Sequence, residues 1–63
     1  MFVLIHKRSG YDDQLVGVFD TMQRAQEEAR LTVDAFVADD KITSMHNMHV
    51  YRMELNKNAV ILK

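Results

Sequence analysis

A single helix-forming segment most constrains how this chain of 63 residues can fold. Asp20 followed by Gln23 fits a capping box, in which the carboxylate accepts from an early helix N–H and the Gln side chain reaches back. No helix-breaking residue follows until beyond Asp40, so we expect one helix of about twenty residues. Because one helix covers only one face of a sheet, the remaining segments must build a small two-layer fold around it.

Apolar residues recur along this segment at the helical period of about 100° per residue. The apolar stripe consists of Met22, Ala25, Ala29, Val33, Phe36 and Val37. Its two central alanines allow the helix axis to approach a sheet closely, while Met22 and Phe36 fill the ends. We therefore expect this side of the helix to face the sheet.

Two β-prone segments, Phe2–His6 and Gln14–Phe19, precede the helix and are joined by a polar loop, which predicts a hairpin. Beyond a loop at 41–47, segment 48–55 alternates in polarity and predicts a third strand. A last β-prone run at 59–62 follows turn-forming residues and predicts a short fourth strand.

Chain direction sets the expected strand order. The second strand ends beside the start of the first, and the helix carries the chain back to the turn end of the hairpin, so the third strand runs antiparallel to the first if the two are neighbours. We predict an α+β fold, ββαβ(β), in which an antiparallel sheet of order 2-1-3 carries one long helix on one face. Residues 1–63 form a single compact domain in this interpretation, and the fourth strand lies beside the third or exchanges with another chain.

Strict alternation leaves one apolar face of the sheet without a helix. We expect that uncovered face to hold Val3, Ile5, Val16 and Val18. We expect the helix side to hold Phe2, Leu4, Leu15 and Phe19. Arg52 and Glu54 of the third strand would border the uncovered face with charge. Self-association through this face is our first expectation, and the alternative is that residues 60–62 fold over part of it.

Two further surfaces carry candidate partner-binding residues. On the outer side of the helix, small and apolar residues recur beside basic ones, which suits close helix pairing. The candidates there are Arg24, Arg30, Leu31 and Ala35. The loop between the first two strands offers mixed charge and one aromatic ring on a scaffold-held tip. The candidates there are Arg8, Tyr11, Asp12 and Asp13.

Residues that carry chemistry in other proteins form no recognisable catalytic or metal motif. The chain lacks cysteine, which removes disulfides, thiolate zinc sites and cysteine nucleophiles. His46 and His49 are three residues apart with methionines nearby, but their predicted loop and strand give no ligand geometry, and methionines usually fill cores. His6 would lie beside His49 across the sheet and form a pH-sensitive pair. We expect a protein with no enzymatic activity, no metal and no cofactor.

Charge and hydropathy narrow the partner class. Eight Lys and Arg against nine Asp and Glu give a formal net charge of -1, so the broad positive field of a nucleic-acid-binding protein is lacking. The alternative function is a nucleic-acid-binding regulator that uses a local patch of Lys7, Arg8 and Arg52, although acidic pairs nearby would repel phosphate. No apolar run approaches the ~20 residues of a membrane span, and we expect a cytoplasmic protein without a membrane contact.

The segment 14–29 also carries a resemblance. Its Val-Gly-Val-Phe strand end, Asp-Thr cap and Ala-x-x-x-Ala helix follow a short N-terminal strand. This pattern resembles that of many very small, uncharacterised bacteriophage and bacterial proteins, and it covers roughly the first two-thirds of the chain. The resemblance implies a ββα unit followed by one or two strands. It also implies a small phage-type regulator that binds a host protein and inhibits or redirects it.

Overall fold

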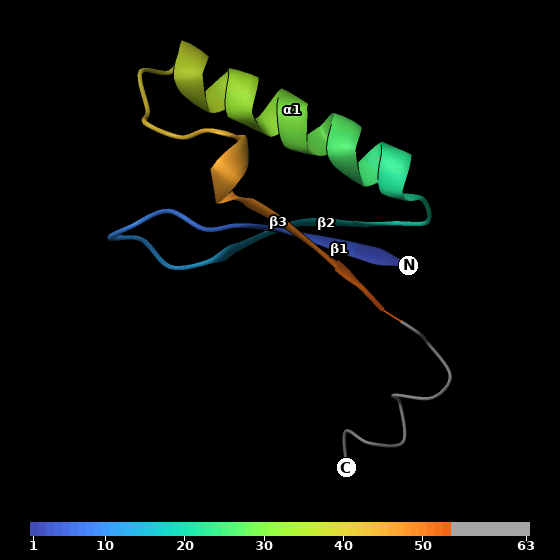
Figure 1. The fold of residues 1–63 in the computed structure, drawn as a ribbon. Coiled ribbons are helices and arrows are strands. Elements are labelled where there is room, and N and C mark those ends of the chain that lie inside the picture. Colours follow the sequence, from blue (N-terminus) through green and yellow to red (C-terminus); the bar gives the residue numbers. More distant parts are fainter. Residues whose placement is uncertain (54–63) are drawn as a thin grey trace.

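The computed structural model describes residues 1–53, which form a three-stranded antiparallel sheet with one helix across one face (Figure 1). The elements are β1 (Phe2–His6), β2 (Gln14–Phe19), α1 (Met22–Ala38), the 3-10 helix η1 (Met45–Asn47) and β3 (Met48–Arg52). The strand order is β2-β1-β3. The predicted α+β class, strand order and single long helix are confirmed. The predicted fourth strand at 59–62 lies outside the described residues.

A β-bulge changes which side chains of β2 face the helix. Leu4 is opposite Gly17 whereas Ile5 is opposite Leu15, so Val16 is an extra residue in the ladder. A bulge of this kind shifts the alternation of side chains by one residue. Leu15 therefore shares a face with Ile5 and is 65% exposed. Our expectation that Leu15 lies on the helix side is wrong because it assumed unbroken alternation.

The register of β3 corrects a second expectation. Ile5 is opposite His49 and Val3 is opposite Tyr51. Residues paired across an antiparallel ladder lie on the same face, so His49 and Tyr51 share the uncovered face with Val3. Arg52 is opposite Phe2 and lies on the helix side, so it does not border the uncovered face. Glu54 lies outside the described residues.

Helix α1 begins one residue later than the capping box predicts. Thr21 is the N-cap, in an extended conformation, and its side-chain oxygen accepts a hydrogen bond from the backbone N–H of Arg24 at 3.1 Å. The predicted box of Asp20 and Gln23 is therefore wrong, because Asp20 and Thr21 are both favourable caps and the sequence does not choose between neighbours. The helix ends at Ala38 after 17 residues, and Asp40 follows in a left-handed conformation with φ 60°.

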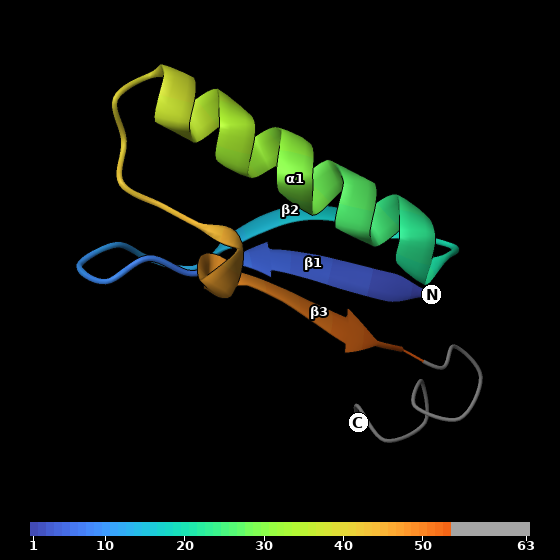
Figure 2. The same ribbon diagram turned by 45° about the horizontal axis from the view of Figure 1, so that its top comes forward.

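The core lies between α1 and the strands β1 and β2. Its buried apolar side chains are Leu4, Ala25, Ala29 and Val33. The two alanines are 0% and 1% exposed and let the helix approach the sheet closely, as predicted. Figure 2 shows that α1 lies over β1 and β2 and that β3 is the strand farthest from it. Met22 and Val37 are exposed at the margins of the stripe, so the helix covers the sheet only in part.

Thr21→Ala tests the corrected start of α1. Loss of the capping oxygen is expected to lower the free energy of unfolding by about 1 kcal/mol and the Tm by roughly 4–8 °C for a domain of this size. Asp20→Ala is the matched control and is expected to change the Tm much less. Thermal unfolding followed by circular dichroism measures both variants, and a larger loss for Asp20→Ala would contradict the assigned cap.

Candidate functional site

The side chain of His6 connects the end of β1 with the loop after α1 through a hydrogen bond. It is 2% exposed, and its Nε2 shares a hydrogen bond of 2.7 Å with the Thr43 hydroxyl. The edge of one ring meets the face of the other between His6 and Phe36, with centroids 4.7 Å apart. These contacts bring the segment that follows the helix against the end of β1.

Asn47 holds η1 against the same end of β1. Its Nδ2 donates to the Lys7 carbonyl at 2.8 Å, and its Oδ1 accepts from the backbone N–H of Ser44 at 3.0 Å. The Lys7 N–H in turn donates to the Asn47 carbonyl at 2.8 Å. Ser44 and Asn47 form the capping box of η1. Asn47 stands where the usual box has Glu or Gln, so the sequence signal for this short helix is the N-cap Ser44 alone.

Burial changes the protonation of His6. Desolvation lowers the pKa of the imidazole below its usual value, and the positive charge of Arg8 lowers that pKa further. The neutral form is therefore favoured in the folded protein. His49 does not pair with His6 as we expected, because His49 is opposite Ile5 and lies on the other face of the sheet.

The loop-tip pocket is a cavity of about 520 Å³ between the β1–β2 loop and the loop after α1. Arg8 and Tyr11 line one side, and Asp40, Lys41 and Ile42 line the other. The Arg8 guanidinium stacks 4.1 Å from the centroid of the Tyr11 ring and 4.9 Å from that of Phe36. These two cation–π contacts hold the side chain in place.

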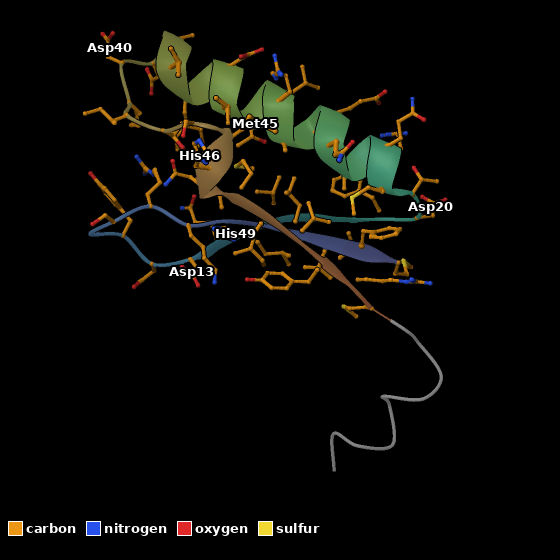
Figure 3. All side chains as sticks on the ribbon, viewed as in Figure 1. Asp13, Asp20, Asp40, Met45, His46 and His49 are labelled. Atoms are coloured by element: carbon orange, nitrogen blue, oxygen red, sulfur yellow. The ribbon has the colours of Figure 1, made fainter. Side chains whose placement is uncertain are left out.

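The four predicted loop-tip residues do not form one cluster. Arg8 and Tyr11 line the pocket, whereas Asp12 does not. Asp13 forms an ion pair of 3.9 Å with Lys7, and this pair is largely exposed to solvent. Figure 3 shows Asp13 and His49 on the side of the sheet away from α1, with Met45 and His46 on the helix side.

The α1–η1 groove is an open cavity of about 780 Å³ between the flank of the helix and η1. It is lined by Gln23, Gln26, Glu27, Arg30, Leu31 and Met45. Leu31 is 59% exposed and Met45 is 39% exposed. The groove thus combines two accessible apolar side chains with amide and charged groups, a composition typical of the contact surfaces of proteins.

The groove includes two of the four candidates predicted on the outer helix side. Arg30 and Leu31 line it directly. Arg24 does not, but its Nε lies 3.9 Å from Oε1 of Glu27, which is one of the lining residues. Ala35 lines a separate hollow with Phe36 and Asp39. Sequence reasoning missed Met45 as a surface residue, because only the tertiary placement of η1 brings it beside α1.

The described residues provide no arrangement typical of a metal site, since nowhere in 1–53 do three His, Asp or Glu side chains gather in a way that could hold an ion. Helix α1 is too short and too polar to cross a membrane, and the described residues contain no other helix that could do so. Within residues 1–53 the accessible features include the groove, the pocket, the smaller hollow beside Ala35 and the face of the sheet away from α1.

Comparison of the chain with protein-family models, with curated proteins and with solved structures finds no match in any of the three.

Lowering the pH is expected to destabilise the protein through His6. Because the folded state depresses this pKa, the unfolded chain binds a proton more readily, and the stability contributed by neutral His6 is lost as the pH falls below about 6.5. His6→Gln retains an amide near Thr43 but cannot titrate. We expect the Tm to fall less between pH values of about 7.5 and 5.5 in this variant than in the parent.

The matched control for this titration is His46→Gln, which removes an exposed imidazole. Its Tm is expected to depend on pH more strongly than that of His6→Gln, which lacks the buried imidazole. An unchanged pH dependence in His6→Gln would contradict the role assigned to His6.

Proposed function

We propose that the protein is a small, non-enzymatic protein-binding module whose α1–η1 groove receives an apolar side chain of its partner. The observation that carries this proposal is the pair of exposed apolar residues, Leu31 and Met45, that line one cavity. Leu31 comes from the helix and Met45 from η1, so the apolar floor exists only in the folded chain. Full burial of a leucine-sized side chain is worth about 1.5–3 kcal/mol, and an open groove would provide part of that.

The border of the groove supports a protein partner. Gln23 and Gln26 offer amide donors and acceptors, while Arg30 and Glu27 offer opposite charges. An apolar centre with a polar rim is the usual composition of a protein interface, in which Arg and Met are enriched. The flexible thioether of Met45 adapts to side chains of different shape.

The loop-tip pocket offers a second contact to such a partner. Arg8 is held between two aromatic rings, and within residues 1–53 it has no carboxylate at ion-pair distance. A guanidinium fixed in this way loses little conformational entropy when it binds a partner carboxylate. The exposed Ile42 at the same pocket, 93% accessible, adds an apolar contact.

The biological role that we propose is that of a phage-type regulator, which binds a host protein in the cytoplasm and inhibits or redirects it. This part rests on the resemblance of segment 14–29 to small phage and bacterial proteins and stays a prediction. The alternative of a nucleic-acid-binding regulator has less support from the geometry. The Lys7 ammonium lies over the Tyr51 ring on the face away from α1, Arg8 lines the loop-tip pocket, and Arg52 lies on the helix side. The three basic residues therefore do not form one patch.

Capture of partners from a bacterial lysate on the tagged protein, with Leu31→Asp beside the parent, tests the proposed groove. The introduced carboxylate is costly to desolvate against an apolar group of the partner. We therefore expect the amount of stoichiometric partner captured to fall at least about tenfold. Val37→Asp is the matched control, because Val37 is 53% exposed on the same helix and does not line the groove. Quantitative mass spectrometry of the eluates, with circular dichroism of each variant, provides the readout.

Equal capture by Leu31→Asp and the parent would contradict the groove as the binding site. Loss of the captured material at high salt or after nuclease treatment would instead support the nucleic-acid alternative.

A further inference from the structure

We infer that the face of the sheet away from α1 is the interface of a homodimer, in which two copies pack these faces together. The open face, as we call this surface, consists of Val3, Ile5, Leu15, Val18, His49 and Tyr51. It lies on the opposite side of the sheet from α1, so this inference does not depend on the proposed groove.

The register places apolar side chains of all three strands side by side on the open face. Val3 of the central strand lies between Val18 and Tyr51, and Ile5 lies between Leu15 and His49. Leu15, Val18 and Tyr51 are 65%, 50% and 45% exposed. The bulge at Val16 adds Leu15 to this surface, so the apolar area extends across the full width of the sheet.

The charges around the open face favour an identical partner. Lys7 and Asp13 stand at one end, where their ion pair of 3.9 Å neutralises both charges, and Lys7 also lies 5.6 Å from the centroid of the Tyr51 ring. No other Lys, Arg, Asp or Glu of the described strands is paired onto this face. With a formal net charge of -1 per chain, two copies repel each other only weakly. An uncharged face is complementary to itself rather than to a strongly charged partner.

The core of a single chain is small, so a dimer would add stability by burying more apolar surface. In residues 1–53 only four apolar side chains are buried, and cores of domains this small rarely supply more than about 3–5 kcal/mol. Two sheets stacked about 10 Å apart would convert two layers into four, with the helices outside. A two-fold axis would place the same residues of both copies in the interface.

The extent of the open face sets the expected affinity. Three strands about 4.8 Å apart and five residues of about 3.3 Å each give a face of roughly 14 by 17 Å. Its projected area is thus roughly 240 Å², well under the about 800 Å² that a standard interface buries on each partner, so this face fits a weak and transient dimer. The dimer is therefore expected to dissociate at micromolar concentrations rather than to be permanent.

Sedimentation velocity of the full chain from about 1 to 500 µM tests the dimer. The parent is expected to shift from one to two chain masses across this range. Val18→Lys and Leu15→Lys each place an ammonium on the open face and are expected to raise the dissociation constant at least about tenfold. Leu31→Lys is the matched control, because Leu31 is similarly exposed but lies on α1, and it is expected to dimerise like the parent.

A second measurement does not depend on whether the variants fold. In a mixture of isotope-labelled and unlabelled parent, the dimer predicts intermolecular nuclear Overhauser effects between the Val18 or Leu15 methyl groups and the Tyr51 ring. A parent that stays monomeric at every concentration would overturn the inference. Protection of the Leu15 methyl groups in that monomer would assign the open face to residues 54–63 of the same chain.

Discussion

The close packing of α1 on β1 and β2 is the contact on which the rest of the structure depends. Ala25 and Ala29 are almost fully buried because their small side chains let the helix approach Leu4 on the central strand. A single helix covers only one face of a sheet, and α1 lies mainly over two of the three strands. The flank of the helix beside η1 and the whole opposite face of the sheet therefore keep apolar side chains accessible. Both proposed interfaces follow from this limited cover.

Hydrogen bonds from the end of β1 hold the loops in position. His6 and Asn47 tie residues 43–47 to this strand through the Thr43 hydroxyl and the Lys7 backbone. The same ties place Met45 beside α1 and the chain after the helix beside Arg8. A buried imidazole thus connects the stability of the fold with the shape of the groove and the pocket. Protonation of His6 would weaken both surfaces together, since the contacts that hold them are shared.

Periodicity was enough to predict the strand bounds of β1 and β2 and the inner side of α1, and chain direction was enough to predict the strand order. It failed where two local solutions have similar energies, as at Asp20 and Thr21, and where one inserted residue changes the alternation, as at Val16. Gly17 is a signal that could have revealed the bulge, because glycine within a strand often accompanies one. At this position an added Cβ would lie 2.8 Å from the Phe19 ring. The sequence predicts Arg30 and Leu31 as surface residues. The cavity that they line is completed by Met45, and no local sequence pattern predicts the position of Met45 beside α1.

The central claim is that a single helix leaves the groove and the open face accessible in the isolated chain. Methyl NMR of the dilute 63-residue chain with a soluble paramagnetic agent measures this accessibility directly. We expect strong relaxation enhancement at the methyl groups of Leu31, Met45, Leu15 and Val18, and weak enhancement at those of Leu4 and Val33. Protection of Leu31 and Met45 equal to that of Leu4 would show that the chain fills its own groove, and would contradict the account.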